Sequence, residues 1–136
     1  MTHRSLLMAT STAFAMLALA LGAQSLDAQA PGFKRVELQR HDIGSTGREA
    51  IMTRAEFQPG AATPKHTHPG EEVAYVLQGE LSIELEGKPA LKLKAGDSFF
   101  VPAGTVHMGK NTAKGETIVL STYVVEKGKP LAATVK

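Results

Sequence analysis

An all-β fold, either a sandwich or a closed barrel, is what the sequence predicts for this chain. Short segments of β-forming or alternating residues recur, separated by turn signals about every eight to twelve residues. Thirteen glycines and seven prolines are spread along the chain, and no long helical pattern of apolar residues follows its N-terminal part. The 136 residues suffice for one domain and not comfortably for two.

Three strands are expected in the first half of the domain. The segment 33–38 is a possible short strand, and 50–57 (AIMTRAEF) can pair before the Gln-Pro-Gly turn at 58–60. The segment 73–77 (VAYVL) is rich in β-forming residues and is followed by a Gln-Gly turn. These turn residues break each strand, as a compact β fold requires.

The second half alternates more clearly. Leu81, Ile83 and Leu85 share one face of the expected strand 80–86, and polar residues share the other. Further strands are expected at 91–94, 98–101 and 117–125, separated by turns or loops at 95–97, 102–104 and 111–115. The polar tail, 126–136, is expected to be mobile at its end.

The first thirty residues have the composition of a signal peptide. Arg4 precedes a run of apolar and small residues, and no acidic residue occurs before Asp27. We expect residues 1–30 to be a Sec-type signal peptide, cleaved near Ala30 or, alternatively, near Ser25. An uncleaved membrane anchor is the other interpretation, because the apolar run approaches the minimum length of a membrane span.

Cleavage would leave residues 31–136 as a single domain in the periplasm or outside the cell, without membrane attachment. The net charge is +2, the lysines are scattered and aromatic residues are few, which argues against nucleic-acid binding. There is no cysteine, so disulfides and thiolate chemistry are excluded. A transition metal could therefore be held only by histidine, aspartate or glutamate.

Two histidines and two glutamates lie within seven positions. His66 and His68 are two residues apart, so on a strand they would point to the same side and could converge on one ion. Beyond a Pro-Gly break, Glu72 shares a face with Ala74 and is the candidate ligand, whereas Glu71 faces the other way and is a weak candidate for an outer base. Taken alone, two histidines at this spacing beside Pro and Gly are more often exposed loop residues than metal ligands.

Two longer patterns include these residues. The spacing G-x5-H-x-H-x3-E-x6-G is matched by Gly60, His66, His68, Glu72 and Gly79. The spacing G-x5-P-x-G-x2-H-x3-N is matched by Gly96, Pro102, Gly104, His107 and Asn111. At all ten positions the chain resembles the cupin superfamily, and these motifs form a core over residues 60–111.

The resemblance implies a double-stranded β-helix, or jelly-roll, barrel. It also implies that His66, His68, Glu72 and His107 meet inside the barrel and bind one divalent metal ion. Nitrogen and oxygen ligands suit Fe, Mn, Cu, Ni or Zn, and the ligand set alone does not choose among them. Asn111 is expected to stabilise a loop through hydrogen bonds to the backbone.

Such a centre would leave positions on the metal for a substrate, so a metal-dependent enzyme acting on a small molecule is the leading hypothesis. Dioxygenase-like oxidation comes first, and Lewis-acid chemistry by a lyase, isomerase or decarboxylase follows. The alternative is a metal- or ligand-binding module without turnover in the periplasm, because a fold does not settle function. The resemblance and the strand edges of an open sheet also predict a homodimer.

Overall fold

The computed structural model describes residues 30–136, and within that range it contains strands and no helix. The all-β prediction is therefore confirmed. Nearly all of the expected signal peptide lies outside the described residues. In the part of the chain from residue 30 onward, no helix is long and apolar enough to cross a membrane.

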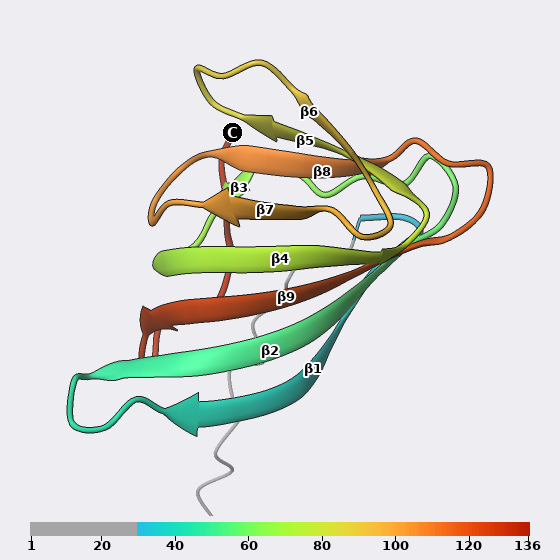
Figure 1. The fold of residues 1–136 in the computed structure, drawn as a ribbon. Coiled ribbons are helices and arrows are strands. Elements are labelled where there is room, and N and C mark those ends of the chain that lie inside the picture. Colours follow the sequence, from blue (N-terminus) through green and yellow to red (C-terminus); the bar gives the residue numbers. More distant parts are fainter. Residues whose placement is uncertain (1–29) are drawn as a thin grey trace, which may run out of the picture.

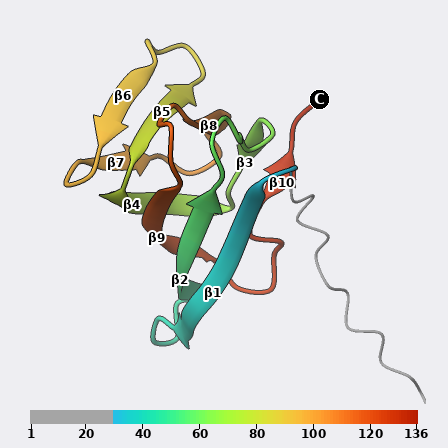
Figure 2. The same cartoon turned by 90° about the vertical axis from the view of Figure 1, so that its right-hand side faces the viewer.

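Ten strands form two five-stranded antiparallel sheets. The first sheet has the order β1-β2-β9-β4-β7 and the second has the order β10-β3-β8-β5-β6. The strands are β1 (Phe33–Asp42), β2 (Arg48–Phe57), β3 (His66–Thr67), β4 (Gly70–Gln78), β5 (Glu80–Leu85), β6 (Leu91–Lys94), β7 (Ser98–Val101), β8 (His107–Asn111), β9 (Thr117–Glu126) and β10 (Ala133–Thr134). Figure 1 shows β1, β2, β9 and β4 fanning out below β8, β5 and β6, and Figure 2 shows the same strands from the side.

Alternation along the strands builds the core between the sheets. Every second residue of β9 is buried from Thr117 to Val125, and β4 buries Glu72, Ala74 and Val76 while exposing the residues between them. This is the period of two that a half-buried strand requires. Apolar side chains of both sheets, such as Val119 and Leu81, pack together in this core, and the polar residues on the same faces are placed at its centre.

The sequence analysis did not predict two of the strands. Residues 107–111 form β8, and residues 133–134, in the tail that was expected to be mobile at its end, form β10. In β10, Ala133 and Thr134 pair with Thr67 and His66, and the Val135 amide donates a hydrogen bond to the Lys65 carbonyl. The C-terminal segment is thus attached to the strand that carries His66.

Gly70 leaves no room for a side chain. A Cβ atom at this position would lie 2.0 Å from the Val124 carbonyl oxygen and 2.6 Å from the Val125 Cα atom. Both atoms belong to the backbone of β9, which is held between β2 and β4 and cannot move aside without breaking hydrogen bonds. We expect Gly70→Ala to lower the free energy of unfolding by about 3 kcal/mol or more.

Urea unfolding of both proteins measures this effect. Gly115→Ala is the matched control, because a Cβ atom there would meet nothing within 4 Å. Equal losses of stability in the two variants would show that the close approach of β4 to β9 is not responsible.

Candidate metal centre

Three histidines converge between the sheets because two short strands pair in one register. His66 of β3 lies directly opposite His107 of β8. His68 follows two residues later, so that its side chain points to the same side as His66. The ring centroids are 4.3 to 5.0 Å apart, all three side chains are buried, and one nitrogen from each lies within 4.8 Å of the others.

Backbone carbonyl groups fix the tautomer of each ring. Nδ1 of His66 lies 2.8 Å from the Pro64 oxygen, and Nδ1 of His107 lies 2.9 Å from the Thr105 oxygen. Nδ1 of His68 lies 2.6 Å from the oxygen of Leu131, in the C-terminal segment. A carbonyl can only accept, so each Nδ1 carries the proton. In the neutral rings, the three Nε2 atoms therefore present lone pairs, as in histidines that bind metals.

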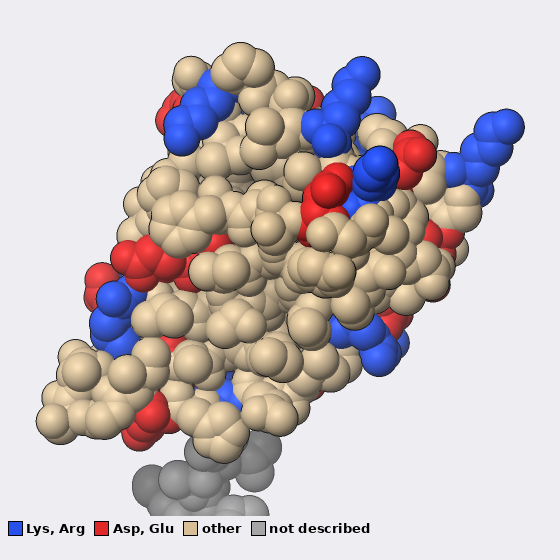
Figure 3. All heavy atoms as spheres, viewed as in Figure 1, with Lys and Arg blue, Asp and Glu red and all other residues tan. Residues whose placement is uncertain are grey.

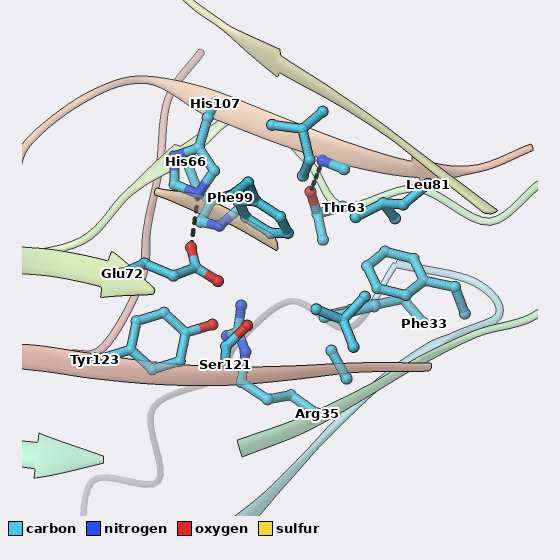
Figure 4. A pocket seen from close by; sticks show the side chains of 15 residues that line it. Phe33, Arg35, Thr63, His66, Glu72, Leu81, Phe99, His107, Ser121 and Tyr123 are labelled. Carbon is cyan, nitrogen blue, oxygen red and sulfur yellow. Dashed lines mark hydrogen bonds and ion pairs between the residues drawn. The ribbon is translucent and has the colours of Figure 1, made fainter. Parts of the chain in front are cut away.

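Glu72 approaches the histidines from the opposite sheet. Its Oε2 atom lies 3.3 Å from Nε2 of both His68 and His107, and Figure 4 shows its carboxylate pointing toward the rings. Burial alone would raise the pKa of this carboxyl group, but its interactions with the His107 and His68 imidazoles outweigh burial and hold the pKa well below its usual value. Glu72 is therefore a buried anion.

These groups fit a cation. In the neutral tautomers, lone pairs on two Nε2 atoms would face a carboxylate oxygen across 3.3 Å, which is unfavourable unless a proton or a metal ion lies between them. The buried Nε2 of His68 makes no hydrogen bond with the described residues, as expected for an atom that is reserved for a ligand. Imidazole nitrogens with one carboxylate suit a divalent transition metal.

A cavity of about 30 Å³ adjoins the cluster. His66, His107 and Glu72 form part of its wall, and most of the remainder is apolar. Ser121 and Tyr123 reach it from β9, and Arg35 reaches it from β1. Figure 4 shows the Tyr123 hydroxyl and Ser121 near the Glu72 carboxylate. The site thus combines a polar end, where a cation and a small molecule would meet, with an apolar end.

Burial also controls the protonation of two neighbours. Burial, and next the nearby His107, lower the pKa of His66 from 6.5 to about 4. His66 is therefore neutral, as a metal ligand must be, over most of the physiological range. Burial, and next the charge of Glu72, raise the pKa of the Tyr123 phenol well above its ordinary value. The phenol is then a hydrogen-bond donor whose ring packs 4.7 Å from that of His68.

Glu71 does not reach the cluster. It lies on the other side of β4 from Glu72, where it is half exposed and forms an ion pair with Arg48. The structure thus brings four of the five candidate site residues together and leaves Glu71 apart; a role for it as an outer base stays a prediction.

Asn111 has the role that the sequence predicted. Its side-chain amide donates to the Phe57 and Gly115 carbonyls, and its oxygen accepts from the Ala113 amide. Three aromatic residues of β4 and β7 differ in their surroundings. Phe99 is buried and lines the cavity, whereas Tyr75 and Phe100 are about half exposed on the outer face of the first sheet.

The sequence analysis did not identify three residues at the polar end of the cavity. Tyr123 and Ser121 could have been found. Successive side chains of a strand point to opposite faces, so the expected strand 117–125 places both residues on one face with Val119. Arg35 has no such signal, since an arginine in a mixed polar segment resembles any solvent-exposed residue.

Comparison with known proteins gives a consistent result. Residues 53–123 match the family model described as "Cupin domain". Germin-like protein subfamily 2 member 2 of Arabidopsis thaliana is 42% identical over 77 residues, which cover 53% of this chain and 35% of that protein. Oxalate oxidase 2 of Hordeum vulgare is 30% identical over 80 residues, with 53% of this chain and 36% of that protein covered.

A solved structure resembles most of this chain. Recombinant oxalate oxidase in complex with glycolate superimposes with a TM-score of 0.63 and 26% identity, over 76% of this chain and 55% of that one. The chain spans only about a third of the curated relatives that it matches. The fold is the jelly roll that the two motifs implied. Because the family model matches more than half of its residues, the chain belongs to the cupin family.

Proposed function

We propose that this protein is an exported, metal-dependent cupin enzyme that oxidises a small molecule in a dioxygenase-like reaction. One observation carries the proposal. Three buried imidazoles, each anchored at Nδ1 by a carbonyl, direct their second nitrogens toward one point beside a buried carboxylate, at the wall of a cavity. His66, His68, His107 and Glu72 would hold one divalent ion, which would supply Lewis acidity and, for a redox-active metal, electron transfer.

The protein's own side chains favour oxidation over acid–base chemistry. The lowered pKa of Glu72 makes its carboxylate a good ligand and a weak base. The raised pKa of Tyr123 keeps its phenol protonated, so that it can orient a substrate by donating a hydrogen bond. The other groups at the polar end, Ser121 and Arg35, are also poor bases. Lyase, isomerase or decarboxylase chemistry would need a base from elsewhere.

The relatives support the same direction. Oxalate oxidases are among the similar proteins, and one was solved with glycolate bound. These names describe oxidation of a small organic acid, and the cavity of about 30 Å³ admits only a molecule of a few non-hydrogen atoms beside an ion.

Oxygen consumption separates this proposal from its alternative, a binding module in the periplasm without turnover. The protein is loaded in turn with Fe, Mn, Cu, Ni or Zn and supplied with small organic acids, enediols and phenols in an oxygen electrode. Turnover with one redox-active metal is expected. Tight metal retention without oxygen uptake or product under any condition would favour the binding module.

Elemental analysis and intact mass of the protein purified from its own compartment test export and metal identity together. We expect one metal ion per chain and loss of residues 1–30, or of residues 1–25. Recovery of the full-length chain in a membrane fraction would instead favour an uncleaved anchor.

We also propose that the protein is a homodimer. The outer face of the first sheet carries four half-exposed apolar side chains: Val73, Tyr75 and Leu77 on β4 and Phe100 on β7. In Figure 3, uncharged side chains fill the middle of the face over these strands, and charged groups lie toward its edges. An apolar centre with a polar rim is the usual anatomy of an interface between subunits, and a second copy would supply a self-complementary surface.

Val73→Lys is expected to convert the dimer to a monomer, because a two-fold axis would bring two like charges into an apolar centre at a cost of several kcal/mol. Light scattering at micromolar concentration measures the mass. Leu91→Lys is the matched control, since Leu91 is similarly exposed but lies on β6 in the second sheet. A monomeric wild-type protein at this concentration would contradict the proposed dimer.

A further inference from the structure

We propose that Leu131, in the C-terminal segment of residues 127–136, positions His68 for metal binding, so that docking of this segment and capture of the ion stabilise each other. The inference rests on the metal centre of the proposed function and adds to it a residue that belongs to neither sequence motif. It depends on one long-range hydrogen bond, on the packing that holds its acceptor in place and on the weak attachment of the rest of the segment.

The three histidines differ in how their rings are oriented. Nδ1 of His66 and Nδ1 of His107 each donate to a carbonyl two residues earlier in the chain, at 2.8 and 2.9 Å. Nδ1 of His68 instead donates over 2.6 Å to the carbonyl of Leu131, which is 63 residues away in the sequence. His66 and His107 are thus oriented by their own segments, whereas the orientation of His68 depends on a distant one.

The side chain of Leu131 holds its carbonyl in place. Ile51, Tyr123 and Val125 form a small buried apolar cluster apart from the main core, and Leu131 packs against this cluster. The ring of Tyr123 also lies 4.7 Å from the ring of His68. Leu131 therefore contacts His68 through its backbone and the wall beside His68 through its side chain, so that loss of the apolar contact should also displace the hydrogen-bond acceptor.

The rest of the segment is weakly attached. Residues 133–136 are exposed, and β10 contributes only Ala133 and Thr134 to the second sheet. Figure 2 shows β10 beside β3, where it forms one edge of that sheet. A short, exposed edge strand opens locally far more readily than the core of a protein. The contacts of Leu131 are therefore important for keeping the segment docked.

This arrangement couples the segment to the metal. When the segment opens, the buried Nδ1–H group of His68 loses its acceptor and the ring is free to turn. A bound ion needs a fixed ring, because one nitrogen of each histidine must face the same point. The open state therefore binds metal more weakly, and by reciprocity a bound ion makes opening of the segment less favourable by the same factor.

Calorimetric zinc titration of the full chain tests the role of Leu131. Leu131→Ser removes the apolar side chain and leaves the backbone carbonyl, whereas Leu131→Met keeps an apolar side chain of similar volume. Val135→Ser is the matched control, because Val135 belongs to the same segment but its side chain is exposed. A cooperative thermal transition establishes that each variant is folded before its zinc affinity is measured.

We expect Leu131→Ser to bind zinc at least about tenfold more weakly than wild type, while Leu131→Met and Val135→Ser stay within about threefold of it. Equal zinc affinities of folded Leu131→Ser and Val135→Ser would overturn the positioning role alone. Failure of the wild type to retain zinc or any other divalent metal would overturn the proposed function together with this inference.

Hydrogen exchange of the wild-type protein, measured by NMR, tests the coupling without any substitution. The Val135 amide, which donates to the Lys65 carbonyl, reports opening of the segment. The Ile43 amide, which donates to the Arg48 carbonyl between β1 and β2, is the reference. Zinc should slow exchange at Val135 by at least about tenfold and leave Ile43 unchanged. No effect at Val135, or an equal effect at both amides, would overturn the coupling even if Leu131→Ser fails to fold.

Discussion

His107→Ala is expected to lower the affinity for the bound divalent metal by at least about 100-fold. Changes to groups that merely orient a ligand cost about 10- to 100-fold, and this change removes a ligand itself. It also removes the residue opposite His66, whose ring centroid lies 4.3 Å away, so the cluster loses its most closely packed pair. Calorimetric titration of the metal-free protein measures the affinity directly.

The same substitution should reduce the stabilisation that metal gives. At a metal concentration 1,000 times the wild-type dissociation constant, binding stabilises the folded protein by about 4 kcal/mol, and a 100-fold weaker site gains only about 1.4 kcal/mol. His41→Ala is the control, because His41 is an exposed residue of β1. If His107→Ala binds metal as tightly as His41→Ala does, the assignment of the four ligands is wrong.

The metal-free protein is expected to lose about 3 kcal/mol of stability between pH 6.5 and pH 4 because of His66 alone. In the unfolded chain this imidazole gains a proton near its ordinary value of 6.5, but in the folded protein burial and the neighbouring His107 lower its pKa to about 4. Over this interval the unfolded state binds more protons, so stability falls as the pH falls. The difference between the two values corresponds to about 3 kcal/mol.

Below this interval a second group acts in the same direction. The lowered pKa of Glu72 contributes stability above its ordinary value of 4.5, and this contribution is lost on further acidification. Urea unfolding at pH 7, 5.5 and 4.5 measures the first effect before the second begins. His66→Gln should remove most of the slope above pH 4.5, whereas His41→Gln should not change it. An equally steep slope in His66→Gln would assign the acid sensitivity to other groups.

The spacing of residues predicted much of this molecule. The division of β4 into two faces was predicted correctly, with Glu72 and Ala74 on one face and Glu71 on the other, because alternation is a local property of a strand. Gly79 and Gly96 have φ values of 80° and 96°, as their place in turns implied. The two motifs likewise indicated which histidines would meet, although the sequence alone left exposed loop residues as an alternative for His66 and His68.

What could not be predicted depends on contacts between distant segments. The strands β3 and β10 have only two residues each, too few for any periodic pattern. They form because β3 pairs with both β10 and β8. The group that orients His68 is a backbone carbonyl of Leu131, which leaves no trace in residue type. Arg35 was missed for a related reason, since its contact with the Tyr123 ring joins β1 to the distant strand β9.

The central place of β9 affects the order of events during synthesis. This strand lies between β2 and β4, yet it is made after both, and its residues Ser121 and Tyr123 close the wall behind Glu72. A nascent chain that has emerged to residue 111 already contains all four candidate ligands but lacks the strand that joins β4 to β2 and encloses the site behind Glu72. We therefore expect the site to be complete only after β9 has docked, so that the environment in which the chain finishes folding decides which metal it meets first.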